Sequence, residues 1–381
     1  MRQTMQKITP ADELLCHQLP ETFATIGESD ISWTEKIWAS LFNTDGSLQI
    51  DCGLGKYPNR NVIDMFAGIS RGAEQWTVRA SRQLDADPDR TGVGPFDYGV
   101  SEPLKTVWFR LGENDALPLS FDVTCRAILP PFLEQKDRQR APVGFRITSD
   151  LLRYHQAVVV SGWVKIGDET VRIDEKRWTG FRDHSWGVRM DVGEPPSDVF
   201  TPNRLEQNFI LQWSPMVFTR PDGSMYEIHH YLQSVDDEVT YFSGYENQAD
   251  GKQVAIHGMR DHLKYDPTNR RLLGGTLELD MGWGKTRTLE VEAVSDTGFH
   301  LGTGLYFGFK GHRHGMWLGR ENLDGERYAD CSDYYTAREV RQLRDCVIRV
   351  SEGDATGYGI FETIIVGEHA RYGLDRELSF L

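Results

Sequence analysis

Short apolar or alternating runs, separated by Gly, Asp and Asn, make up most of this chain. The run 158–166 is typical of a strand, 167–169 of a turn, and 170–178 of the returning strand. Asp-Gly pairs predict further hairpin turns, at 44–46, 221–223, 249–251 and 323–325. Closely spaced strands without alternating helices predict an all-β fold, either an antiparallel barrel or a sandwich.

Helical patterns are few, and only residues 11–19 and 336–344 predict short helices. Two longer segments, 38–50 and 213–228, resemble each other. Each runs from a Trp through an apolar strand and a Phe to an Asp-Gly-Ser turn and a second strand. Because they lie about half the chain apart, they predict two similar β-barrels in tandem. We place these domains at residues 1–192 and 193–381.

Composition narrows the classes of function. The chain has 381 residues with 39% hydrophobic content and ten Trp, which is enough for large cores and apolar pockets. A net charge of −15 argues against nucleic acid and anionic lipid as partners. We see no signal peptide and no membrane span, so we expect a cytoplasmic protein. The oligomeric state, including a homodimer, stays open.

The five Cys are scattered and form no CxxC pair, which indicates reduced, mostly buried thiols. Motifs for a nucleophile elbow, a phosphate loop and an HExxH zinc site are missing from the sequence. These absences argue against the enzyme classes that these motifs define.

The segment Thr179–Met190 is the densest group of chemically active side chains. Asp183 lies among aromatic residues, where desolvation would raise its pKa and make it a general acid. His184 would serve as a base or orient Asp183. The alternative is structural, because Asp183 could instead pair with a nearby guanidinium and join two elements. The candidates for that pairing are Arg177, Arg182 and Arg189.

A second group lies in Tyr306–Trp317. On a strand, His312 and His314 would point to the same face, as two metal ligands do. Further ligands could come from His229-His230 and Asp261-His262. Since no third ligand stands at a recognisable spacing, we favour a pocket lined by His312 or His314 without a metal.

Asp183-His184-Ser185-Trp186-Gly187 resembles the DHxxG signature of the AttH/carotenoid 1,2-hydratase-like superfamily. Residues 53–60 and 357–362 are similar to an uncharacterised bacterial branch of that superfamily. The resemblance implies two lipocalin-like barrels and a cofactor-free enzyme acting on a hydrophobic alkene or polyketide-like ligand. It also implies that Asp183 protonates the alkene. A late Tyr of the family could match Tyr306, Tyr334 or Tyr358.

We therefore predict a cofactor-independent lyase or isomerase that transfers protons on a terpenoid, steroid-like or aromatic molecule. The candidate catalytic residues are Asp183, His184 and Tyr306. The candidate substrate-binding residues are Trp178, Trp186, Arg189, His312, His314, Trp317 and Tyr358. Two alternatives stay open: a carrier that binds such a ligand unchanged, and a metal-dependent hydrolase that uses the His-rich strands.

Overall fold

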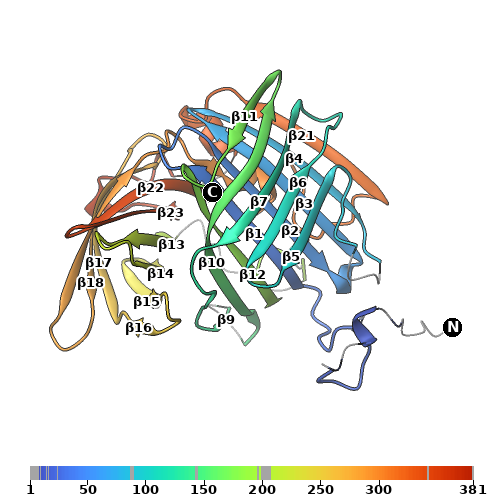
Figure 1. Cartoon of the computed structure of the whole chain (residues 1–381), viewed down its shortest axis with the longest axis horizontal. Coiled ribbons are helices and arrows are strands. Elements are labelled where there is room, and N and C mark those ends of the chain that lie inside the picture. The colour runs from blue at the N-terminus through green and yellow to red at the C-terminus, as the bar shows by residue number, and fades with distance from the viewer. Residues whose placement is uncertain are drawn as a thin grey trace.

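Two curled antiparallel β-sheets, packed against each other, form the protein (Figure 1). The computed structural model describes residues 8, 10–13, 15, 17–23, 25–85, 90–141, 145–194, 197–198, 207–340 and 343–379. Within these residues there is a single short α-helix, α1 (Tyr334–Glu339). The predicted all-β fold with few short helices is therefore confirmed.

The first sheet, sheet A, has thirteen strands. Its order is β21-β4-β3-β2-β1-β12-β10-β7-β6-β5, and β8, β9 and β11 also pair with β10. Its strands are β1 (Trp33–Asn43), β2 (Gln49–Tyr57), β3 (Val62–Arg71), β4 (Glu74–Gln83), β5 (Phe96–Glu102), β6 (Thr106–Leu111), β7 (Leu119–Ala127), β8 (Phe132–Leu133), β9 (Asp137–Arg140), β10 (Ile147–Ile166), β11 (Glu169–Ile173), β12 (Trp178–Val188) and β21 (Glu321–Tyr328).

The second sheet, sheet B, has ten strands in the order β16-β15-β14-β13-β23-β22-β19-β18-β17, and β20 pairs with β22. Its strands are β13 (Phe209–Thr219), β14 (Met225–Val235), β15 (Glu238–Gln248), β16 (Gln253–Ala255), β17 (Gly258–Tyr265), β18 (Leu272–Asp280), β19 (Thr286–Ala293), β20 (Phe299–His300), β22 (Arg344–Glu352) and β23 (Ala355–Val366). Short 3₁₀ turns complete the fold: η1 (Pro10–Glu13), η2 (Pro58–Arg60), η4 (Leu301–Gly304) and η5 (Ala370–Tyr372).

The strand β21 follows β20 in the chain but belongs to sheet A, where it pairs with β4. Figure 1 shows it in orange beside the blue N-terminal strands. Arg79 on β4 forms ion pairs with Asp324 and Glu326 on β21, at 2.7 and 2.5 Å. Sheet A therefore includes a strand from the C-terminal half of the chain. The predicted domain division at residue 192 stays a prediction.

The two similar segments form the first hairpin of each sheet, β1–β2 and β13–β14. Their turn glycines, Gly46 and Gly223, have φ angles of 75° and 83°. The segments begin with Trp38 and Trp213, whose rings contact each other edge to face with their centroids 5.4 Å apart. The sequence similarity thus corresponds to equivalent positions in the two sheets.

Not every expected turn or helix is present. The turn predicted at 323–325 is wrong, because these residues lie inside β21. A Cβ on Gly325 would lie 2.8 Å from the Thr77 carbonyl oxygen, so this glycine allows close strand packing rather than chain reversal. The helix predicted at 336–344 is α1, which ends at Glu339, and 11–19 contains only the turn η1 among its described residues.

Alternation along the central strands produces three apolar clusters. On β1, Ile37 and Leu41 face the core of sheet A, whereas Trp38 and Phe42 face sheet B. On β23, Phe361 belongs to the core of sheet B and the residues beside it face sheet A. Both faces of these strands are therefore buried. We call the side chains that lie between the two sheets the inter-sheet layer.

Two further expectations concern single residues and the membrane. Of the five cysteines, four lie in the described residues, and all four are buried and free, namely Cys52, Cys125, Cys331 and Cys346. None of the described helices has the length and apolar character needed to cross a bilayer. Cys16 lies outside the described residues.

Candidate functional site

Many ionisable side chains lie in the inter-sheet layer, where they are largely or fully buried. Strand register explains their convergence, since residues paired across neighbouring strands point to the same face of the sheet. Perturbed ionisable groups gathered in one place are typical of functional sites. The group comprises Lys36, Asp51, Asp64, Arg153, His155 and Asp183 from sheet A, Glu227, His229, Asp345 and Glu362 from sheet B, and Glu134, Tyr306 and His314 from connecting segments.

Asp183 points into this layer from β12, opposite Trp38 on β1 and His155 on β10. Its Oδ2 lies 3.4 Å from Arg153 Nε. Its Oδ1 and the Trp38 Nε1 are both buried without a hydrogen-bond partner. Burial raises the pKa of Asp183, although the charges of Arg153 and Arg189 oppose the shift. The ion pair is thus with Arg153, a residue that the sequence interpretation did not name.

His184 follows Asp183 on β12 and therefore points to the opposite face of sheet A. Its Nε2 lies 2.9 Å from Glu35 Oε1, and its Nδ1 lies 3.4 Å from the Tyr154 hydroxyl. The hydrogen bond with His184 lowers the pKa of Glu35. Together with Trp33 and Trp186, these residues line a pocket of about 420 Å³. The structure does not bring Asp183 and His184 together.

Lys36 belongs to a chain of polar contacts in the inter-sheet layer. Its Nζ lies 2.9 Å from His314 Nε2 and 3.6 Å from the centre of the Tyr306 ring. The His314 Nδ1 lies 3.4 Å from Asp64 Oδ1, which also accepts a hydrogen bond from the Tyr57 hydroxyl. Burial lowers the pKa of Lys36 well below its ordinary value and that of His314 to about 4. His314 is therefore held neutral near pH 7.

The other predicted site residues are dispersed. Trp178 lies in the core of sheet A, and Trp186 lines the pocket beside His184. The Arg189 Nη2 donates to Ser185 Oγ at 2.7 Å, and Arg189 acts on the charges of the inter-sheet layer. Tyr358 lies at the edge of the cluster between the sheets.

The segment with His312 and His314 is not a strand. It is a series of turns in which His312 closes a bridge with Phe309. His314 is buried, His312 is half-buried, and Trp317 is 54% exposed. The same-face geometry expected for His312 and His314 is therefore wrong, because it requires extended backbone. Of the late Tyr candidates, Tyr306 lies in the inter-sheet layer beside Lys36.

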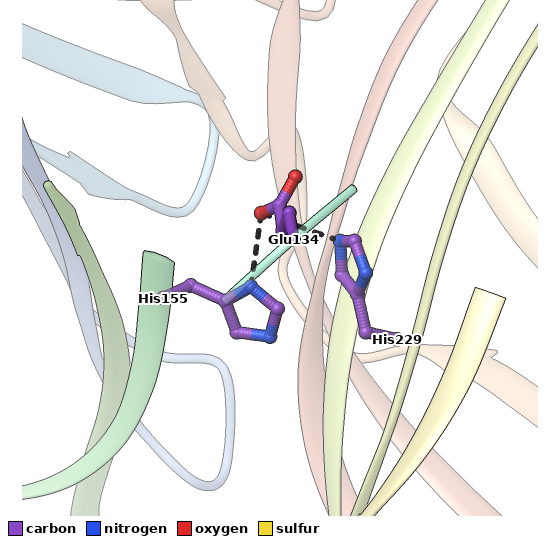
Figure 2. Close-up of side chains that lie close together, drawn as sticks. All are labelled: Glu134, His155 and His229. Atoms are coloured by element: carbon purple, nitrogen blue, oxygen red, sulfur yellow. Dashed lines mark hydrogen bonds and ion pairs between the residues drawn. The ribbon is translucent and has the colours of Figure 1, made fainter. Parts of the chain in front are cut away.

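Three separate segments bring Glu134, His155 and His229 together (Figure 2). Glu134 Oε1 lies 2.9 Å from His155 Nδ1 and 3.7 Å from His229 Nε2. The other ring nitrogen of His155 lies 2.5 Å from Glu227 Oε1. Burial opposes the charge of His155, but Glu227 and Glu134 outweigh it and raise its pKa to about 9. Burial and the neighbouring His155 lower the pKa of His229 well below its ordinary value.

Sequence reasoning named His229 only as an additional ligand and missed Glu134 and His155. Each of these two is a lone polar residue near an apolar strand, and no local spacing links them. The signal that could have found them is the pairing of β10 with β12, which places His155 directly opposite Asp183.

Three buried carboxyl groups complete the layer. Burial raises the pKa of Asp51 on β2 and of Glu362 on β23 to about 7. It also raises the pKa of Asp345 on β22 well above its ordinary value, with added repulsion from Glu362 and Asp51. A substantial share of these carboxyl groups is therefore protonated at neutral pH, and a protonated carboxyl group can donate a proton.

A family described as "Family of unknown function (DUF8625)" matches residues 8–375. The search of curated proteins finds no match. Among solved structures, an AttH-like protein from Nitrosomonas europaea is similar, with a TM-score of 0.49 and 12% identity over 87% of this chain and 92% of that one.

Kievitone hydratase from Nectria haematococca has a TM-score of 0.40 and 12% identity over 94% of this chain and 96% of its own. CghA in complex with Sch210972 has a TM-score of 0.42 and 10% identity over 88% of this chain and 89% of its own.

Proposed function

We propose that this chain, which belongs to the family of unknown function DUF8625, is a lyase or isomerase acting on a hydrophobic small molecule. It would add, remove or relocate atoms at a carbon–carbon double bond by proton transfer, without a redox cofactor. The reaction would take place in the inter-sheet layer, with Asp183 as the proton donor.

The observation that carries this proposal is the state of the Asp183 carboxyl group. It is buried, its pKa is raised, and its Oδ1 has no hydrogen-bond partner. The nearby Trp38 Nε1 is a buried donor that also lacks a partner. An acid with one oxygen free of hydrogen bonds and a donor without a partner, on neighbouring strands, suit a hydroxyl group or water molecule that takes part in the reaction.

Aromatic rings support a transient positive charge in the same layer. Trp38 and Trp213 contact each other across the two sheets, and Arg153 already lies 5.7 Å from the centre of the Trp213 ring. Indole faces attract cations, so they would stabilise a carbocation formed beside Asp183. The arrangement therefore favours an apolar substrate whose double bond accepts a proton.

In the hydration direction, the Asp183 carboxylic acid gives its proton to one alkene carbon, forming a C–H bond as the π bond breaks. Water then forms a C–O bond with the resulting cation and returns one proton to the Asp183 carboxylate. The net change is the addition of one water. Isomerisation follows if the cation instead loses a proton from a neighbouring carbon.

A solvent-isotope experiment tests this function without knowledge of the substrate. The protein is incubated with a lipophilic extract of the producing organism in D₂O or H₂¹⁸O, and the products are examined by mass spectrometry. We expect solvent-derived deuterium or ¹⁸O in at least one compound. The Asp183→Asn variant should reduce the rate of incorporation by at least ~100-fold, because it removes the general acid.

The matched control is Asp122→Asn, which removes a carboxylate in a surface ion pair with Arg110. This variant should keep the wild-type rate. Thermal unfolding of both variants checks that they fold. Full turnover by a folded Asp183→Asn variant would exclude Asp183 as the acid, and a ligand that is retained but never converted would support the carrier function instead.

A further inference from the structure

Two imidazoles and one carboxylate meet between the sheets at Glu134, His155 and His229 (Figure 2). Glu134 directly follows β8, and its backbone N–H donates to the Arg153 carbonyl at 2.9 Å, which fixes it beside β10. His155 lies on β10 and His229 on β14, so the group joins sheet A to sheet B. Their ligand atoms all lie within 4.8 Å of one another.

His229 is buried against the rings of Phe132, His155 and Trp213, but its ring nitrogens form no hydrogen bond. It is 1% exposed, and neither Nδ1 nor Nε2 has a hydrogen-bond partner. A buried polar group left without a partner destabilises the folded state, so such a group calls for a physical explanation. A metal ion bound to Nε2 would provide that explanation, since this atom already faces Glu134 at 3.7 Å.

The surroundings also resemble those of metal ligands. A metal-bound His usually donates its other ring N–H to a carboxylate. His155 has this arrangement: one nitrogen faces Glu134 Oε1, and the other lies 2.5 Å from Glu227 Oε1. Trp213 Nε1 donates to the same Glu134 oxygen at 3.2 Å, which orients the carboxylate.

We propose that Glu134, His155 and His229 bind a divalent transition-metal ion, most consistent with zinc, and that Glu227 positions His155 from behind. Zinc bonds of about 2.0–2.2 Å in a tetrahedron place neighbouring ligand atoms about 3.3 Å apart. The two separations from Glu134 Oε1, 2.9 and 3.7 Å, lie on either side of this value. Small side-chain shifts therefore complete the site.

The proposed ion differs from the sequence expectation of no metal and does not rest on the proposed function. Its ligands come from both sheets, so it would cross-link them beside the Asp183 region. Arg153 connects the two regions, since it forms ion pairs with Glu134 at 3.6 Å and with Asp183 at 3.4 Å. Asp183 itself is not a ligand.

Metal content of the full-length protein tests the inference. The protein is unfolded in chelator, refolded with Zn²⁺ or Co²⁺, passed through a desalting column, and analysed by elemental mass spectrometry. We expect about one ion per chain, a visible absorption band with Co²⁺, and a higher melting temperature than that of the metal-free protein. His155→Gln and His229→Gln should weaken Zn²⁺ binding by about 100-fold or more, and Glu227→Gln by about 10–100-fold.

The matched control is His230→Gln. His230 is the next residue on β14, is equally buried and lacks partners on both ring nitrogens, but it contacts Phe361 in the core of sheet B. This variant and Asp183→Asn should both retain the ion. The inference is overturned if the wild type holds less than about a tenth of an ion per chain with either metal. It is also overturned if the folded His229→Gln variant binds as much metal as the His230→Gln variant.

Discussion

Asp51 is wholly buried on the inter-sheet face of β2, and this burial raises its pKa to about 7. The polar side chains of Asp345, Ser40 and Gln49 beside it reduce the shift without cancelling it. In an unfolded chain the same carboxyl group has a pKa of about 3.9. The folded state thus binds this proton more tightly than the unfolded state, so Asp51 links stability to pH.

This linkage predicts the behaviour of Asp51→Asn. The contribution of protonated Asp51 to stability is complete below about pH 4 and is lost as pH rises to about 7. We therefore compare the melting temperature of the variant with that of the wild type at each pH. Relative to the wild type, the variant should gain at least about 3 °C between pH 5 and pH 8. Scanning calorimetry at several pH values measures the difference. An equal difference at both pH values would mean that the pKa of Asp51 is not raised.

Single residues also mark the limit of what the sequence could predict about the site. Asp183 stood out because its neighbours in the chain are chemically active, and the structure indeed buries it in a charged layer. Its ion-pair partner Arg153 could not be identified, because it lies on a different strand. Glu134 and His155 were missed for the same reason: their chemistry depends on strand pairing rather than on spacing along the chain.

At the scale of the strand, β12 separates two kinds of chemistry. Asp183 faces the inter-sheet layer, whereas His184 faces the pocket lined by Trp33 and Trp186. Period-two alternation makes this separation unavoidable for adjacent residues. The sequence interpretation grouped Asp183 and His184 in one site because they are adjacent in the chain. Adjacency alone does not show that their side chains point to opposite faces of the strand.

The opposite directions of these side chains predict that His184→Gln leaves Asp183-dependent isotope incorporation within about twofold of wild type. The same variant should weaken binding of an apolar fluorescent probe that quenches Trp33 or Trp186, because it alters the pocket wall. Isotope incorporation and a fluorescence titration together measure both effects. Loss of incorporation equal to that of Asp183→Asn would show that the two residues act in one site.

Close strand contacts give another prediction at this scale. A Cβ on Gly357 in β23 would lie 1.8 Å from the Val217 carbonyl oxygen on β13, whereas one on Gly258 would meet nothing closer than 3.9 Å. Gly357→Ala should therefore destabilise the protein by at least ~2 kcal/mol through overpacking. Gly258→Ala should change stability by less than ~0.5 kcal/mol. Chemical unfolding compares the two, and equal effects would contradict the close contact.

Turn prediction succeeded where glycine adopts a positive φ, as at Gly46 and Gly223. It failed at 323–325, where the same Asp-Gly pair lies inside β21. An Asp-Gly pair permits a turn but does not require one, since strand pairing with β4 supplies competing hydrogen bonds. The fold class could therefore be predicted, but the partner of each strand could not.

At the scale of the molecule, the stability of both sheets depends on the inter-sheet layer. Trp213 packs against Trp38 and donates to Glu134, so it contacts sheet A through both its ring and its N–H group. Trp213→Ala should destabilise the protein by about 3–5 kcal/mol, as large deletions in cores do. Trp317→Ala, at a position that is 54% exposed, should cost less than ~0.5 kcal/mol.

Denaturant unfolding followed by fluorescence and circular dichroism measures both Trp variants. We expect one cooperative transition in the wild type, because sheet A contains β21 and the inter-sheet layer is buried on both sides. Two well-separated transitions, or equal stability losses for Trp213→Ala and Trp317→Ala, would contradict a shared core.

The position of β21 has a consequence for how the protein is made. The ribosome releases β4 early, yet the strand that covers its edge emerges only after the strands from β5 to β20 have been made. Throughout that interval the nascent chain exposes an uncovered row of backbone amides and carbonyls, the kind of template on which chains associate. Sheet A is therefore completed only after most strands of sheet B have been made. A polypeptide truncated after β20 would leave the edge of β4 uncovered and open to aggregation.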